Sequence, residues 1–257
     1  MKRMSYELFA SNLNLSQGDR IFVSSDISRL AFSWHLDGEV FNANLFIESI
    51  MNVIGEDGTL VFPTYNWGFC KGIDFNYCET PSKVGALTNV ALKREDFTRT
   101  KHPIYSFAVW GKDTRNLYAL ENKSSFGGDS PFAYFYDNHF TNLIIDLGFE
   151  DTGTFVHYCE EKIGVPYRLN KDFTSGYIDE TGTREMRTYS MYVRPLDIEV
   201  GVAIAPMNEV FFENNVIQAD TVCGIRVELL NMRKAYDLIE FDILNNRSRR
   251  IAAYPGQ

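Results

Sequence analysis

The chain has 257 residues, of which 45% are hydrophobic and 23% are charged. These proportions are ordinary for a soluble globular protein, so they exclude a disordered chain and a fibre, and the length is sufficient for a sizeable core. With 25 Lys and Arg against 34 Asp and Glu, the formal net charge of −9 disfavours nucleic acid and favours a cationic partner.

Helix-like and strand-like stretches alternate through the first two thirds of the chain. Gly55 stands where a helix C-cap requires it, and Pro63 ends an apolar run. Buried strands are expected as short apolar runs between turn residues, and helices as apolar residues at helical spacing. The predicted elements, in chain order, are an amphipathic start, a strand over 20–24, a helix over 45–54, a strand over 58–63, a helix over 84–93, a strand over 106–111, a short helix over 115–120 and a strand over 143–148.

From residue 171 the sequence becomes richer in Gly, Thr, Asp and Tyr. Here the pattern predicts a strand over 189–194, a helix over 227–236 and a last strand over 239–243. The expected fold is therefore α/β, with a mixed sheet flanked by helices and a smaller α+β C-terminal lobe. We expect residues 1–170 to form the catalytic α/β region and residues 171–257 the lobe packed on it, in one continuous domain.

The sequence predicts a cytoplasmic protein without membrane partners. No apolar run approaches the roughly 20 residues that cross a bilayer, and the start, MKRMSYELFASNL, lacks the apolar region of a signal peptide. The four cysteines are Cys70, Cys78, Cys159 and Cys223. They form no CxxC pair, so free or buried thiols are favoured over disulfides.

One segment, Thr154 to Glu160, carries the clearest chemical signal. If Thr154 caps a helix with its side chain, His157 and Glu160 lie three residues apart on one helical face. A carboxylate that accepts from one imidazole nitrogen fixes the tautomer and raises the basicity of the other, as a general base requires. The alternative is a solvated acid beside a half-buried histidine without catalytic function.

Two other functions of the same segment are disfavoured. A zinc site would need ligands from unrelated segments, because HxxE is not HExxH and the remaining histidines are His35, His102 and His139. A nucleophilic Cys159 paired with His157 is also disfavoured, since residues two apart on a helix point in different directions. No metal is therefore expected.

Several stretches, in order along one domain, resemble the aminoglycoside 3-N-acetyltransferase family. They are Gly18-Asp19 leading into Val23-Ser24-Ser25, the run Gly58-Thr59-Leu60-Val61-Phe62-Pro63-Thr64-Tyr65-Asn66-Trp67, the run Pro81-Ser82-Lys83-Val84-Gly85-Ala86-Leu87, Arg99-Thr100-Lys101-His102-Pro103 with Ser106, Phe126-Gly127-Gly128-Asp129-Ser130-Pro131-Phe132, and the segment from Thr154 to Glu160 with Pro166-Tyr167-Arg168.

The resemblance implies a fold distinct from the common GNAT-type acetyltransferase fold, and a cleft in which acetyl-CoA or a larger acyl-CoA meets the amine of an amino sugar. It implies that His157 is the base and Glu160 the acid that orients it. Direct transfer fits this chemistry, because the amine loses a proton as it attacks the thioester. Thr64 and nearby backbone amides are candidates for stabilising the oxyanion.

The remaining site residues are expected by the chemistry of their side chains. Hydroxyl and cationic groups suited to the pantetheine and phosphates of the acyl-CoA are Ser24, Ser25, Lys83, Arg99, His102 and Ser106. Aromatic and acidic groups suited to the sugar and its amines are Tyr65, Trp67, Asp74 and Glu79. The alternatives are strand-end turn residues for Ser24 and Ser25, and a loop salt bridge for Arg99. For the aromatic and acidic residues, the alternatives are ordinary loop aromatics and solvated acids.

Departures from the family pattern leave the acceptor amine open. Family members commonly carry His before the paired serines and Leu after them, where this chain has Val23 and Asp26. Arg187 and Arg194 lie in the divergent last third and suit a phosphate-bearing ligand. The acceptor is therefore either an aminoglycoside-like amine, as in antibiotic resistance, or a nucleotide-linked amino sugar. A non-catalytic ligand-binding protein and a metal-dependent hydrolase are the alternatives, and a homo-oligomer is possible.

Overall fold

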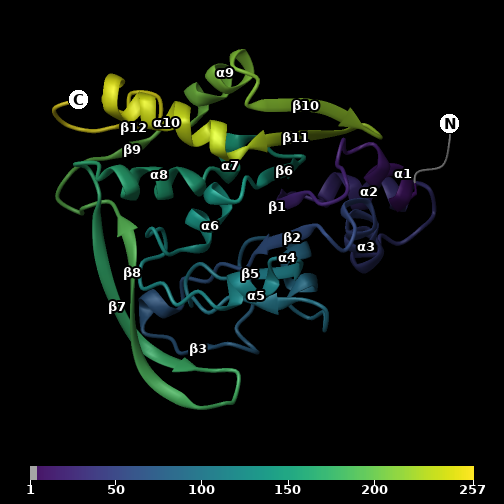
Figure 1. Ribbon diagram of the computed structural model, residues 1–257, viewed down its shortest axis with the longest axis horizontal. Coiled ribbons are helices and arrows are strands. Elements are labelled where there is room, and N and C mark those ends of the chain that lie inside the picture. Colours follow the sequence, from purple (N-terminus) through teal and green to yellow (C-terminus); the bar gives the residue numbers. More distant parts are fainter. Residues whose placement is uncertain (1–4) are drawn as a thin grey trace.

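The computed structural model describes residues 5–257, which form a mixed α/β structure around a seven-stranded sheet (Figure 1). The strand order is β10-β11-β6-β1-β2-β5-β4. The strands, in that order, span Ile217–Val222, Ile225–Asn231, Thr141–Ile145, Arg20–Ser25, Thr59–Pro63, Phe107–Gly111 and Thr98–Arg99. The three central strands β6, β1 and β2 are parallel, and the outer pairs are antiparallel.

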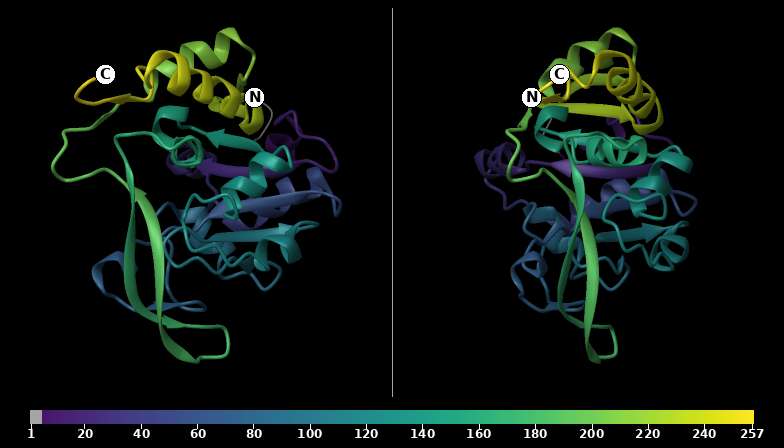
Figure 2. Two further views of the ribbon diagram at one scale, coloured as in Figure 1. Left: turned by 60° about the vertical axis from the view of Figure 1, so that its left-hand side comes forward. Right: turned by 90° about the vertical axis from the view of Figure 1, so that its left-hand side faces the viewer.

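Two smaller sheets complete the strands. One has the order β3-β7-β8, with strands at Phe75–Asn76, Leu169–Ile178 and Arg184–Val193. The β7–β8 hairpin runs along one side of the molecule and stands out from the body in the side views (Figure 2). The other sheet pairs β9 (Gly201–Val202) with β12 (Ala252–Ala253).

Helices cover both faces of the main sheet. Neighbouring residues of one strand point to opposite faces and therefore enter different core clusters. Ile21 and Val23 pack in one core cluster, and Phe22 between them packs in the other. The helices on the Ile21 side are α1 (Tyr6–Ser11), α2 (Ser28–Leu36), α3 (Ala43–Ile54) and α4 (Ala86–Ala91). Residues of the opposite cluster come from α5 (Thr114–Tyr118), α6 (Pro131–Asp137), α7 (Phe149–Thr152), α8 (Phe155–Ile163), α9 (Ala205–Glu213), α10 (Met232–Asn246) and the 3-10 helix η1 (Phe69–Lys71).

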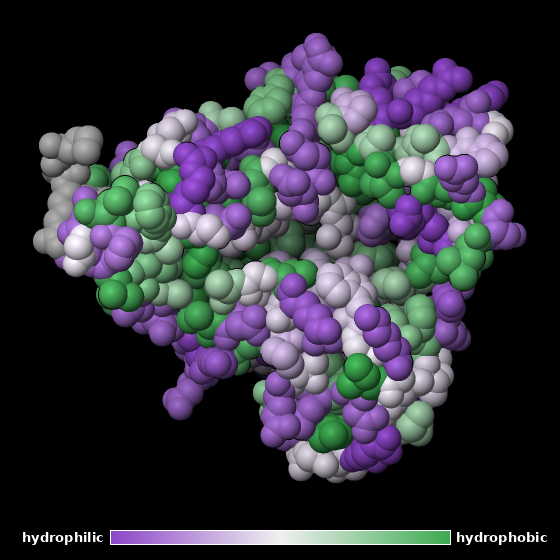
Figure 3. All heavy atoms as spheres, turned by 180° about the vertical axis from the view of Figure 1, so that it is seen from behind, coloured by the Kyte–Doolittle hydropathy of each residue, from purple (hydrophilic) through white to green (hydrophobic). Residues whose placement is uncertain are grey.

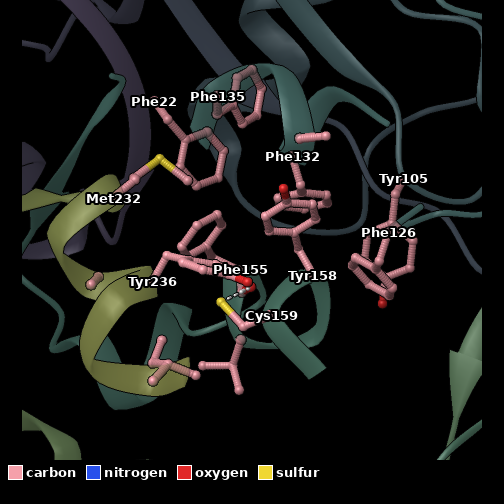
Figure 4. Packing of buried hydrophobic residues seen from close by; sticks show 14 of the residues in the cluster. Phe22, Tyr105, Phe126, Phe132, Phe135, Phe155, Tyr158, Cys159, Met232 and Tyr236 are labelled. Atoms are coloured by element: carbon pink, nitrogen blue, oxygen red, sulfur yellow. Dashed lines mark hydrogen bonds between the residues drawn. The ribbon is translucent and has the colours of Figure 1, made fainter. Parts of the chain in front are cut away.

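The cluster on the Phe22 side is rich in aromatic residues. Phe22 stacks on Phe135 of α6 at 5.8 Å between ring centroids, and Phe135 contacts Phe107 of β5. Figure 4 shows how side chains from β1, α6, α8 and α10 meet there, with Tyr105 and Phe126 at one end. The aromatic content of the sequence is therefore used mainly for packing, as expected for large apolar side chains.

Predictions for the first two thirds of the chain agree with the structure to within a few residues. Those for the last third are wrong in two places: residues 227–231, predicted as the start of a helix, belong to β11, and residues 239–243, predicted as a strand, lie inside α10. Periodicity alone does not separate short apolar runs into helix and strand. The strand is decided by its pairing with β10 and β6 on both sides, and α10 begins only where Asn231 caps it by accepting from the amide of Lys234.

Residues 171–257 are divided between two parts of the structure. The strands β10 and β11 extend the main sheet, whereas β7 and β8 form the protruding hairpin. Buried residues of α9, α10, β10 and β11 join the same core cluster as β1 and β6, including Met207, Phe211, Ile217, Leu230 and Ile239. The C-terminal third is thus continuous with the core of the first.

The surface mixes hydrophilic and hydrophobic residues, with a hollow near the middle of the face seen from behind (Figure 3). Within residues 5–257, no helix is long and apolar enough to cross a bilayer.

Candidate functional site

The candidate site lies beyond the carboxyl ends of the parallel strands. The strands β1, β2 and β6 run in one direction, so the segments that follow Ser25, Pro63 and Ile145 leave from the same edge of the sheet. Ligands of open α/β sheets bind at this edge. It is the segment after β6 that leads, through α7, to α8 and His157.

Helix α8 sets the spacing of His157 and Glu160. Thr154 is its N-cap residue, but the predicted side-chain cap is wrong: the backbone carbonyl of Thr154, not its hydroxyl, accepts from the His157 amide at 3.1 Å. The backbone of Thr154 is already helical, at φ −54° and ψ −30°, which differs from the extended conformation of a side-chain cap. The helix ends at Gly164, whose left-handed φ of 80° turns the chain back toward β7.

His157, Glu160 and Arg168 form one chain of contacts. Nδ1 of His157 lies 2.7 Å from Oε2 of Glu160, and the same oxygen lies 2.6 Å from Nε of Arg168. The side chains of Glu160 and Arg168 are 1% and 6% exposed, whereas that of His157 is 23% exposed. The imidazole is thus the member of the group that reaches solvent.

The carboxylate of Glu160 is kept charged despite its burial. Burial acts to raise its pKa, but the hydrogen bond with His157 and the charge of Arg168 outweigh that effect and hold the pKa below its usual value. An ionised acceptor at Nδ1 requires the imidazole proton to sit there, which leaves Nε2 as the basic nitrogen. Nε2 has no hydrogen-bond partner among the described residues.

A cleft of about 480 Å³ opens at His157. Its inner wall includes Trp67, Tyr105 and Arg168, and its outer wall is built by the end of β8 and the loop that follows. The outer wall is mostly apolar and consists of Met191, Tyr192, Val193, Arg194, Pro195, Leu196, Ile198, Val200 and Val202. Among the described residues that line this cleft there is no Asp or Glu, since Glu160 is buried behind His157.

The structure brings Trp67 to the cleft, but not Tyr65. Tyr65 is 4% exposed and its hydroxyl has no hydrogen-bond partner. Its ring lies 4.6 Å from that of Tyr105, between centroids. Trp67 donates from Nε1 to the Tyr105 hydroxyl at 3.4 Å, so the wall predicted for the sugar is made by Trp67 and Tyr105.

Three residues predicted for the site, Thr64, Ser106 and Arg99, form a buried cluster that does not line the cleft. The hydroxyls of Thr64 and Ser106 share a hydrogen bond of 2.8 Å, and Ser106 also accepts from Nε of Arg99 at 3.0 Å. Arg99 donates further to the carbonyls of Tyr77 and Thr80. Burial lowers the pKa of Arg99 to about 10. Because no described acid pairs with it, the backbone carbonyls that accept from the guanidinium group stabilise its buried charge.

His102 is also buried, at 2% exposure. Its Nδ1 accepts from the amides of Ile104 and Tyr105, and Nε2 lies 3.3 Å from the carbonyl of Lys123. Burial lowers its pKa from 6.5 to about 3, so the ring is neutral at physiological pH. In this position His102 fixes the turn that carries Tyr105.

The other predicted residues lie outside the cleft. Ser24 is buried and donates to Asn142 at 3.1 Å, Ser25 ends β1, and Lys83 is exposed. Asp74 is exposed and pairs with Arg184 of β8 at 2.6 Å. Glu79 accepts from the side chain of Asn76 at 2.9 Å.

A second pocket, of about 360 Å³, lies further along β8. Its cationic residues are Lys101, Lys123 and Arg187. Each has an acidic partner, namely Glu121, Asp172 and Glu185. Of the two arginines singled out in the last third of the sequence, Arg194 therefore lines the cleft at His157 and Arg187 lines this second pocket.

The described residues contain no group of three or more His, Cys, Asp and Glu side chains arranged for a metal ion. All four cysteines are free, and Cys159 is fully buried.

Two residues of the site were not assigned to it from the sequence, Arg168 and Tyr105. Arg168 reaches Glu160 only because Gly164 reverses the chain after α8. Tyr105 follows the motif of Arg99 and His102, but its approach to Trp67 depends on how β5 is placed beside β2. Neither contact has a spacing signal in the sequence.

Comparisons with known proteins agree with this architecture. Residues 24–241 match the sequence profile of a family described as aminoglycoside 3-N-acetyltransferase. A similar protein is the SPbeta prophage-derived aminoglycoside N(3')-acetyltransferase-like protein YokD of Bacillus subtilis (strain 168), which is 25% identical over 266 residues, covering 93% of this chain and 91% of that protein.

Solved structures resemble the whole fold. The crystal structure of YokD from Bacillus subtilis has a TM-score of 0.78 at 20% identity and covers 97% of this chain and 96% of its own. AAC-IIIb in a binary complex with CoASH has a TM-score of 0.77 at 16% identity, with 95% and 96% covered. Sisomicin-bound AAC-VIa has a TM-score of 0.77 at 16% identity, with 96% and 99% covered.

The mixed α/β fold predicted from the sequence is thereby confirmed, and the family match covers most of the chain. The chain belongs to the aminoglycoside 3-N-acetyltransferase family, whose members are CoA-dependent N-acyltransferases.

Proposed function

We propose that this protein transfers an acyl group from acetyl-CoA to a primary amine of an amino sugar, by direct attack, with His157 as the general base. The observation that carries the proposal is the contact of His157 with buried, ionised Glu160 at 2.7 Å, at the wall of a cleft. In this arrangement Nε2 accepts the proton that the amine releases. The family match supports an acyl-CoA as donor and an aminoglycoside as the first class of acceptor to test.

The charge of the cleft favours a second class of acceptor, an amino sugar that carries a phosphate, as a nucleotide-linked sugar does. The described residues that line the cleft include the cations Arg168 and Arg194 but no carboxylate. An aminoglycoside is a polycation and would meet no compensating charge there. Arg194 holds the carbonyl of Val200 with one nitrogen at 2.7 Å, which leaves further N–H groups for an anion.

Asp197 and Glu199 provide the contrary possibility. Both lie on the loop that forms the outer wall and are exposed, although neither lines the cleft. The acceptor panel therefore compares polycationic amines with phosphate-bearing amines.

The test is a thiol-release assay with acetyl-CoA and longer acyl-CoAs against a panel of aminoglycosides and nucleotide-linked amino sugars. The His157→Ala variant provides the background rate for each amine. The proposal predicts thiol release above that background with at least one amine, and the cleft charge predicts that phosphate-bearing amines have the higher kcat/KM. Thiol release at the background rate with every amine would contradict the proposed function.

A further inference from the structure

The reaction needs a hydrogen-bond donor for the oxygen of the thioester carbonyl, because that oxygen becomes negative when the amine attacks. Thr64, the candidate from the sequence, is fully buried and shares its hydroxyl with Ser106. It does not line the cleft at His157. The Thr64 hydroxyl is therefore not placed to donate to an oxygen in this cleft.

Tyr105 carries a hydroxyl at the wall of this cleft. It lines the same cleft as His157, and one ring joins the two: Phe126 lies 4.8 Å from Tyr105 and 5.4 Å from His157, between ring centroids. Figure 4 shows Tyr105 against Phe126 at the edge of the aromatic cluster. Tyr105 and His157 thus contact the same phenylalanine ring and line the same cleft.

The Tyr105 side chain is held in a fixed orientation. It is 7% exposed and packs between Tyr65 and Phe126. Its backbone amide donates to Nδ1 of buried His102, so the turn that carries it is also fixed. A donor that does not need to reorganise during the reaction is the kind that stabilises a transition state most.

The hydroxyl has its proton available. Its oxygen accepts from Nε1 of Trp67 at 3.4 Å, and none of the described residues accepts the phenolic proton. Burial raises the pKa of Tyr105, with smaller effects from Trp67 and from nearby charges that include Arg168, so the phenol is protonated at neutral pH.

We propose that Tyr105 donates a hydrogen bond to the oxyanion of the tetrahedral intermediate. The assignment rests on the proposed function. The amine nitrogen forms a bond to the thioester carbon, the carbonyl electron pair moves to oxygen, and Tyr105 donates to that oxygen. His157 takes the proton from nitrogen, the C–S bond breaks, and the thiolate receives that proton, which gives the amide and free CoA.

The first test is Tyr105→Phe, which removes one oxygen and keeps the ring. Loss of a single oxyanion donor costs about 100- to 1000-fold in kcat, so we expect a decrease of that size with KM for both substrates within about threefold of wild type. Tyr177→Phe is the matched control: it also removes a buried tyrosine hydroxyl, one that donates to the Lys101 carbonyl at 2.9 Å away from the cleft. Its kcat stays within about threefold of wild type.

The second test uses a fluorinated tyrosine placed at position 105 alone, which lowers the pKa of the phenol with little change in the shape of the ring. If the proton of Tyr105 is used, the alkaline limb of the kcat profile moves to lower pH, because ionisation removes the donor. A purely structural role leaves the profile unchanged. If Tyr105→Phe fails to fold, the fluorinated variant still tests the role of the Tyr105 proton.

The outcomes separate the two proposals. An active wild type with an equally active, folded Tyr105→Phe variant, or with an unmoved alkaline limb in the fluorinated variant, would overturn the role of Tyr105 alone. Thiol release by wild type at background with every amine would contradict the proposed function itself.

Discussion

His157 and Arg168 contact the same carboxylate oxygen, Oε2 of Glu160, at 2.7 Å and 2.6 Å. One buried acid thus contacts a half-buried base and a buried cation. The arginine offsets the burial of the carboxylate, and the carboxylate in turn orients the imidazole.

Glu160→Gln is expected to weaken both catalysis and stability. The neutral amide no longer holds the imidazole proton on Nδ1 as a carboxylate does, and turnover falls by about 10-fold or more. Arg168, 6% exposed, is left without its counter-charge, which costs about 3 to 5 kcal/mol of unfolding free energy. Steady-state kinetics and urea denaturation measure the two effects.

The control for that variant is Glu161→Gln, which changes the neighbouring acid that accepts from Ser124 at 2.7 Å. The Glu161 side chain contacts neither His157 nor Arg168, so the turnover of Glu161→Gln stays near that of wild type. Equal turnover of Glu160→Gln and Glu161→Gln would contradict the role of Glu160.

Lowering the pH is expected to destabilise the folded protein through His102. Its folded pKa of about 3 is below the unfolded value of 6.5, so the unfolded state binds more protons between these pH values and stability falls as pH falls through 6.5. From pH 7 to pH 4.5 this contributes a loss of about 3 kcal/mol. We expect the loss in His102→Gln to be smaller by about that amount, as measured by denaturant unfolding at both pH values. Identical losses in the two proteins would show that His102 is not neutral and buried.

Arg194→Gln tests the charge of the cleft. With a nucleotide-linked amino sugar as acceptor, KM rises by about 10-fold or more, the effect of losing one charge-assisted hydrogen bond. The KM for acetyl-CoA and the KM for an amino sugar without a phosphate stay unchanged. Arg187→Gln, in the second pocket, is the control. A rise in KM for acetyl-CoA instead would show that Arg194 binds the acyl donor rather than the acceptor.

Much of the fold could be predicted from the sequence where the local pattern and the tertiary environment agree. The strand at Arg20–Ser25 is apolar between turn residues, and the helix at Ala43–Ile54 has a clear apolar face and ends before Gly55. At the C-terminal end the tertiary environment decides: Ile225–Asn231 becomes a strand because β10 and β6 pair with both of its edges. Met232, Ala235, Tyr236 and Ile239 are buried at helical spacing, a signal that the sequence did contain for α10.

The site followed the same rule. His157 and Glu160 could be paired from their spacing on one helix, since that geometry is local. Arg99 and His102 belong to a motif, but the structure buries both and occupies their polar atoms with backbone groups. Whether a motif residue meets a ligand or supports the chain depends on burial, which sequence spacing does not reveal.

The most direct test of the proposed mechanism is the turnover of His157→Ala with the amine that wild type acylates best. If His157 is the base, kcat falls by about 100-fold or more while denaturant unfolding remains cooperative with a similar midpoint, because the imidazole is partly exposed and packs mainly at the cleft wall. Near-wild-type turnover of a folded His157→Ala protein would contradict the account.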